Sequence, residues 1–110
     1  MTLLMSHNYS HDLALLRFLL ATPACYIGVM GPRKRTERML RELAATEAME
    51  RLHSPVGLDI GANGPAEIAL SIVAEMRAVL DGRHGGMLRE RQGSIQGSPA
   101  KERVLSMVAA

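Results

Sequence analysis

Aromatic side chains and cysteine are scarce in this chain. Of its 110 residues only 3% are aromatic, none is tryptophan, and Cys25 is the single cysteine. One cysteine excludes an internal disulfide and is typical of a protein from a reducing compartment. Cys25 lies in an apolar run between Ala24 and Tyr26, so we expect a buried, unreactive side chain. The core must therefore be built from aliphatic residues and the eight methionines, which fill space adaptably.

Long apolar runs and an excess of one charge are absent as well. Apolar residues make up 47% and charged residues 22% of the chain, as in an ordinary globular domain, and the net charge is only +2. Acidic and basic residues alternate over residues 33–51, which argues against nucleic-acid binding. Polar residues interrupt the apolar start of the chain, and no run approaches the roughly 18 residues of a membrane span. We therefore expect a cytoplasmic protein that does not bind a membrane.

The first half of the chain has the pattern strand, helix, strand, helix. An apolar run over residues 2–5 predicts a short strand. Ser10 can cap a helix that continues, with leucines at helical spacing, until Pro23 stops it. The continuous apolar run 25–30 predicts a strand that is buried on both faces of a parallel sheet. Pro32 suits the first turn of the next helix, which carries a narrow apolar stripe.

The second half begins with a short helical or irregular piece over residues 49–52, followed by a glycine-rich loop over 53–64. Pro65 opens a long helix whose two neighbouring apolar stripes predict deep burial. These stripes consist of Ile68, Ile72 and Met76, and of Ala69, Val73 and Leu80. The remaining polar line consists of Glu67, Ser71 and Glu75. Beyond residue 82 we expect an extended tail with a weak helix over residues 99–108.

This order of elements predicts an α/β fold, an incomplete Rossmann-like domain with two to three parallel strands, three main helices and an irregular C-terminal tail. So few strands cannot cover the helices, and the edge of the first strand would be open to pairing. We therefore expect residues 1–82 to form one half of a domain and residues 83–110 its tail. A second chain or an oligomer mate would supply the missing half of the sheet.

A turn after the second predicted strand is the first candidate binding site. Gly28 and Gly31 lie at the end of this strand, and Arg33 and Lys34 follow at the start of a helix. The carboxyl end of a parallel strand and the N–H groups of a helix start commonly bind phosphate. The alternative is a strand-to-helix turn with a solvated basic first turn and no ligand. The glycine spacing is not that of a GxGxxG motif.

Two further candidates lie in loops. Asp59 stands between Gly57 and Gly61, which gives a carboxylate on a loop whose backbone can approach a ligand closely, and Glu67 follows in the first turn of the next helix. The alternative is that both carboxylates only brace the loop and the helix start. His7 ends the first strand, where it could hydrogen-bond a phosphate or a pterin edge or simply brace the loop.

Motifs for catalysis or metal binding are not found. The four histidines show no metal-ligand spacing, and the chain has no nucleophile elbow, Walker sequence or CxxC. Catalysis by this chain alone is therefore not predicted.

Four stretches resemble, in order, one known family. They are MSHNYSHDLALL, YIGVMGPRKRTERMLREL, LHSPVGLDIGANGPAEIALSIVAEMRAVL and GRHGGMLRERQGSIQ. Together they resemble the C-terminal Rossmann-type domain of the XdhC/CoxI family, accessory proteins that mature molybdenum hydroxylases such as xanthine dehydrogenase. His7 matches the family's Met-Thr-His element. Pro32 stands where the family usually has serine, and Asn63 where it usually has an acidic residue.

The resemblance implies an accessory, chaperone-like factor that is not an enzyme. Such a factor binds molybdenum cofactor and delivers it to a molybdenum hydroxylase apo-enzyme, here in a truncated or split form, because the family's first strand and glycine-rich turn are not found in this sequence. Two alternatives stay open: a subunit of an oxidoreductase that binds an NAD-type nucleotide, and an interaction module without a ligand. Binding of molybdopterin or of a nicotinamide cofactor would discriminate between them.

Overall fold

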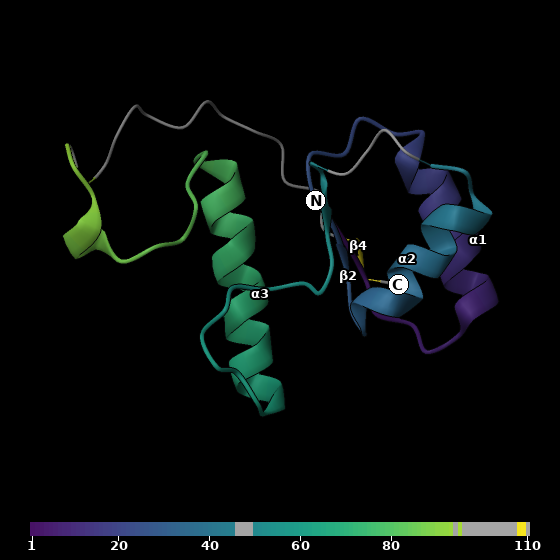
Figure 1. The fold of residues 1–110 in the computed structure, drawn as a ribbon, viewed down its shortest axis with the longest axis horizontal. Coiled ribbons are helices and arrows are strands. Elements are labelled where there is room, and N and C mark those ends of the chain that lie inside the picture. Colours follow the sequence, from purple (N-terminus) through teal and green to yellow (C-terminus); the bar gives the residue numbers. More distant parts are fainter. Residues whose placement is uncertain (46–49, 94, 96–107, 110) are drawn as a thin grey trace.

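A parallel sheet with helices on both faces forms the framework of the chain. A computed structural model describes residues 1–45, 50–93, 95 and 108–109. The strands β1 (Thr2–Leu4), β2 (Ile27–Val29), β3 (Leu52–His53) and β4 (Val108–Ala109) are ordered β3-β2-β1-β4 and all run parallel. Helices α1 (Tyr9–Leu20) and α2 (Arg33–Glu42) cover one face, and α3 (Pro65–Leu80) covers the other (Figure 1). The predicted α/β fold, a partial Rossmann-like domain, is confirmed.

Both faces of the central strands are buried, as the apolar run 25–30 predicts. Because successive side chains of a strand point to opposite faces, the apolar residues divide between two cores. One core packs under α1 and α2 and consists of Leu4, Leu16, Ile27, Val29 and Met39. The other packs under α3 and consists of Met1, Tyr26, Ile72 and Met76. Cys25, just before β2, is exposed, so the expectation of a buried thiol is wrong.

The starts of α1 and α2 differ by one or two residues from the prediction. Asn8, not Ser10, caps α1: its backbone is extended and its side-chain oxygen accepts a hydrogen bond from the His11 N–H at 3.1 Å. Pro32 is the N-cap of α2 rather than a residue of its first turn. It provides no side-chain oxygen, so no side chain caps this helix start.

Helix α3 begins at Pro65 as predicted, but it is buried along only one of its two apolar stripes. Ile72 and Met76 are 6% and 5% exposed, whereas Val73 of the second stripe and its neighbour Leu70 are 58% and 62% exposed. The prediction that both stripes are deeply buried is therefore wrong in this chain. A single layer of short strands contacts one side of a helix and leaves the adjacent side open.

The sheet is wider than the sequence indicates. Leu52 and His53 form β3, although the sequence predicts a helical or irregular piece there, and residues 46–49 lie outside the described part. The expectation of an open edge at β1 is also wrong, because β4 pairs there, with Thr2 opposite Val108 and Leu3 opposite Ala109. The tail includes a short 3-10 helix, η1 (Leu88–Glu90). Of the helix expected over residues 99–108, Val108 lies in β4 and the others are outside the described residues.

Candidate functional site

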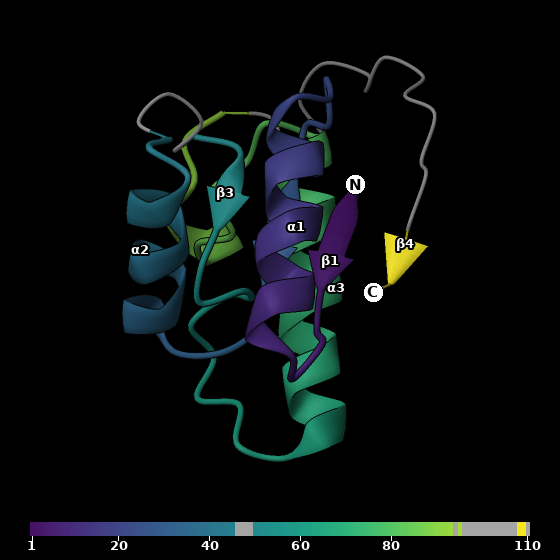
Figure 2. The same ribbon diagram turned by 90° about the vertical axis from the view of Figure 1, so that its right-hand side faces the viewer.

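Three loops meet at the carboxyl end of the sheet, which lies at the lower end of Figure 2 together with the start of α3. These loops follow β1, β2 and β3, and they include residues 5–8, 30–32 and 54–64. Ligands of open parallel sheets bind at this edge, because strand ends and helix starts place backbone groups and variable side chains around one crevice. Two adjacent cavities occur here, and they share Met30 and Gly31.

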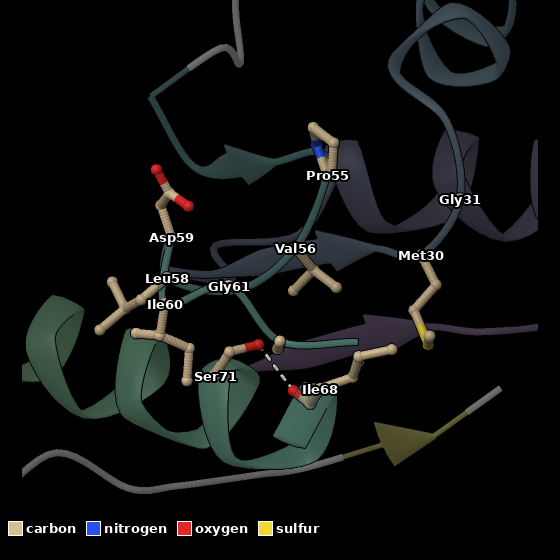
Figure 3. Close-up of a pocket in the computed structure, with 11 residues that line it drawn as sticks. Met30, Gly31, Pro55, Val56, Leu58, Asp59, Ile60, Gly61, Ile68 and Ser71 are labelled. Carbon is tan, nitrogen blue, oxygen red and sulfur yellow. Dashed lines mark hydrogen bonds between the residues drawn. The ribbon is translucent and has the colours of Figure 1, made fainter. Parts of the chain in front are cut away.

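The first cavity, called here the loop cavity, has a volume of about 300 Å³. It lies between the end of β2, the loop after β3 and the start of α3 (Figure 3). Its lining residues are Met30, Gly31, Pro55, Val56, Leu58, Asp59, Ile60, Gly61, Ala62, Ile68 and Ser71. Val56 and Met30 are directed toward α3, whereas the exposed Asp59 carboxylate points away from that helix. The lining thus combines apolar side chains with the polar residues Ser71 and Asp59, which suits a flat ligand that also forms hydrogen bonds.

The second cavity, called here the histidine cavity, has a volume of about 350 Å³ and is lined by Met5, Ser6, His7, Met30, Gly31, Pro32 and Arg35. His7 and Gly31, two of the predicted site residues, thus line the same cavity. Arg33 and Lys34 are exposed and line neither cavity. The cation that reaches the cavity is Arg35, whose guanidinium forms an ion pair with the buried Asp12 at 2.9 Å.

The carboxylate of Glu75 braces the loop after β3 from within α3. Its Oε1 accepts a hydrogen bond from the Tyr26 hydroxyl at 2.7 Å and another from the Gly57 N–H at 3.0 Å. The His53 ring stacks on Tyr26 with the ring centres 4.4 Å apart, and its Nδ1 lies 3.6 Å from the same Oε1. Burial, and then the bond to Glu75, raise the pKa of Tyr26 well above its usual range, so the hydroxyl remains a donor.

Two glycines of the predicted site allow close packing. A Cβ on Gly57, whose φ is +108°, would lie 2.5 Å from the Ser71 Oγ, and one on Gly28 would lie 2.7 Å from Val56. These positions let the loop approach α3 and β2 directly. Gly61 has a φ of +73° and lines the loop cavity, and a Cβ at this position would have no neighbour within 4 Å. Gly31, Asp59 and Gly61 thus line the same cavity. Gly28 and Gly57 do not line it, but they pack against the lining residues Val56 and Ser71.

Glu67 holds the start of α3. Its Oε2 accepts hydrogen bonds from the backbone N–H groups of Gly64 at 2.8 Å and Asn63 at 3.2 Å. These bonds, with Gly64 the larger contributor, hold the pKa of the Glu67 carboxyl below its usual range. The structure therefore places Glu67 in the bracing role that the sequence leaves open, and outside both cavity linings.

Sequence reasoning misses three contributors to this site, Asp12, Arg35 and Glu75. It does not single out Asp12 or Arg35, and it assigns Glu75 only to the polar line of its helix. Period-3.6 patterns place residues on a face of their own helix but do not show which loop or helix covers that face. Among the described residues, no group of three or more His, Cys, Asp or Glu could hold a metal ion, and no helix is long and apolar enough to cross a membrane.

Residues 1–76 match the XdhC Rossmann domain, a stretch that includes both cavities. The chain belongs to the XdhC Rossmann-domain family. The family resemblance is thereby confirmed over residues 1–76, while the fourth stretch, residues 82–96, lies outside the match.

Similar proteins are considerably longer than this chain. A probable xanthine dehydrogenase subunit of Bacillus subtilis (strain 168) is 44% identical over 71 residues, which cover 64% of this chain and 21% of the relative. An uncharacterized protein of Escherichia coli K12, YqeB, is 38% identical over 74 residues, or 14% of its length. A crystal structure of a xanthine dehydrogenase from Bacillus halodurans matches with a TM-score of 0.64 and 41% identity, covering 73% of this chain and 24% of that one. The chain thus spans about a quarter or less of each relative.

Proposed function

We propose that this chain is part of an accessory factor for a molybdenum hydroxylase and binds molybdenum cofactor for delivery to an apo-enzyme of the xanthine dehydrogenase type. Membership of the XdhC family supports an accessory role associated with xanthine dehydrogenase. The paired cavities at the carboxyl end of the sheet are the observation that carries cofactor binding. In this proposal the chain holds and transfers the cofactor and does not turn over a substrate.

The residues of the two cavities fit the organic part of the cofactor. Apolar side chains in the lining of the loop cavity, such as Val56 and Leu58, suit contact with the flat pterin ring, and His7 in the histidine cavity can hydrogen-bond a phosphate or the pterin edge. A thiolate ligand for the metal is not among the lining residues, because Cys25 precedes β2 and lies at the opposite end of the sheet. When bound, the cofactor would supply the molybdenum chemistry of the recipient enzyme, and this chain would orient and shield the pterin.

The test is a thermal melt of the full chain with molybdenum cofactor or with NAD. A ligand at about 100 times its Kd stabilises the folded state by about 2.7 kcal/mol, which raises Tm by several degrees or more. We expect this rise with molybdenum cofactor and not with NAD. Ala62→Trp, which fills the loop cavity, should abolish it, while Ala66→Trp on the exposed side of α3 should not.

Each other outcome points to a different function. A rise in Tm with NAD alone would replace the proposal by the nucleotide-binding subunit of an oxidoreductase. No rise with either ligand would favour an interaction module. An equal loss of binding in Ala62→Trp and Ala66→Trp would show that the loop cavity is not the binding site.

The outer side of α3 supports a second part of the proposal, a partner chain that completes the domain. Leu70 and Val73 are large apolar side chains, 62% and 58% exposed, on the helix that covers one face of the sheet. Adjacent exposed apolar residues on one helix are typical of a surface that is covered in the assembled protein. We propose that a chain or oligomer mate carrying further strands and helices of the domain packs there.

We expect the 110-residue chain alone to self-associate, and the double variant Leu70→Ser with Val73→Ser to reduce that association. The control is Phe18→Ser, because Phe18 is 67% exposed but lies on α1, across the sheet. Size-exclusion chromatography with light scattering measures the outcome. A strictly monomeric parent chain with a sharp cooperative melt would refute the need for a partner.

A further inference from the structure

Arg35 is the cationic side chain that faces the candidate site. It lines the histidine cavity together with Ser6 and His7, whereas the neighbouring Arg33 and Lys34 are exposed and line neither cavity. All three residues begin the same helix, so their different placement follows from the helical rotation of about 100° per residue. Arg35 is therefore the candidate ligand-binding cation of this helix, and Arg33 and Lys34 can serve as controls for the loss of a positive charge.

A buried carboxylate fixes the position of Arg35. The Asp12 side chain is only 1% exposed, and its Oδ2 accepts a hydrogen bond from the Arg35 Nη2 at 2.9 Å. An isolated buried carboxylate is costly, so Asp12 requires its partner, and the pair joins the start of α1 to the start of α2. The guanidinium is further held with its carbon 5.6 Å from the centre of the Tyr9 ring. Arg35 is therefore oriented before any ligand binds.

The Asp12 pair uses only part of the hydrogen-bonding capacity of Arg35. A guanidinium carries five N–H donors in a planar fork, and the hydrogen bond to Asp12 comes from Nη2 alone. The Arg35 side chain as a whole is 22% exposed, and it lines the histidine cavity. A held, planar, partly accessible guanidinium is the group that recognises phosphate oxygens in two-point contacts at low entropic cost.

We propose that the histidine cavity is a phosphate-binding pocket in which Arg35 receives the anionic group, while the loop cavity takes the remainder of the ligand. The two cavities share Met30 and Gly31, so one ligand can occupy both. This assignment rests on the proposed cofactor binding for the identity of the ligand. The assignment goes beyond the proposed function because it names the cation that recognises the phosphate and gives the orientation of the ligand.

The test is isothermal titration of the full chain with inorganic pyrophosphate at constant ionic strength. Removing Arg35 alone would leave Asp12 buried without a partner and could unfold the chain, so the test variant is the neutral pair Asp12→Asn with Arg35→Gln. We expect it to bind pyrophosphate at least about tenfold more weakly, the value of roughly one charge-assisted contact. Arg33→Gln removes the same charge from the exposed side of α2 and should change the affinity by less than about twofold.

Asp12→Asn alone completes the design, because it keeps the cation while removing the carboxylate charge. It should bind pyrophosphate at least as tightly as the parent chain. The proposal is overturned if the double variant binds as tightly as Asp12→Asn, if Arg33→Gln is weakened as much as the double variant, or if the parent chain does not bind pyrophosphate. Arg35-dependent binding would support it even if molybdenum cofactor does not raise Tm, so the two proposals can fail separately.

Discussion

Replacement of Ile72 by aspartate is expected to unfold most of the chain. Ile72 is 6% exposed and packs in the core under α3 with Met1, Tyr26 and Met76. An unpaired charge at such a position is costly, and we expect a loss of about 3 kcal/mol or more in the free energy of unfolding. That is a large share of the roughly 5–15 kcal/mol that stabilises a typical domain. Urea titration followed by circular dichroism measures the loss.

The adjacent residue provides the control. Val73→Asp introduces the same charge into the same helix at a side chain that is 58% exposed. Helix propensity and charge repulsion change almost equally in the two variants, so the difference between them reports burial alone. Equal losses would mean that α3 does not pack on the sheet through Ile72.

Glu75→Ala is expected to destabilise the chain by about 2–3 kcal/mol, because it leaves two donors, one of them the hydroxyl of the buried Tyr26, without their acceptor. The Tyr26 hydroxyl and the Gly57 N–H both donate to the Glu75 Oε1, and Tyr26 is fully buried. Sequence alone places Glu75 only in the polar line of its helix, which would predict a small effect on stability. The loop after β3 should also lose protection in amide hydrogen exchange, with Gly57 affected first.

Two variants distinguish the loss of the Glu75 hydrogen bonds from the loss of a negative charge as the cause of the lower stability. Glu75→Gln keeps an oxygen acceptor at the same place and should retain most of the stability. Glu67→Ala removes a carboxylate that also accepts two backbone hydrogen bonds, but at an exposed helix start, and its effect should be much smaller. A loss in Glu67→Ala as large as that in Glu75→Ala would contradict the special role of the partly buried Glu75.

The sequence alone determines most of the local structure. The continuous apolar run 25–30 predicts a strand with two buried faces, and β2 has them. Pro65 predicts the start of α3, and the stripe of Ile72 and Met76 predicts its buried side. These features depend on neighbours within about four residues, and backbone sterics and side-chain periodicity act over that range.

Tertiary structure alone decides which residues face the site. The arginines at 33 and 35 look equivalent in the sequence, yet only Arg35 meets Asp12, 23 positions away. Glu75 becomes a partly buried brace only because the loop carrying Gly57 folds onto α3. Val73 stays exposed although it continues an apolar stripe, because short strands cover only one side of the helix. Such contacts join segments far apart in the chain, so periodicity within one segment cannot reveal them.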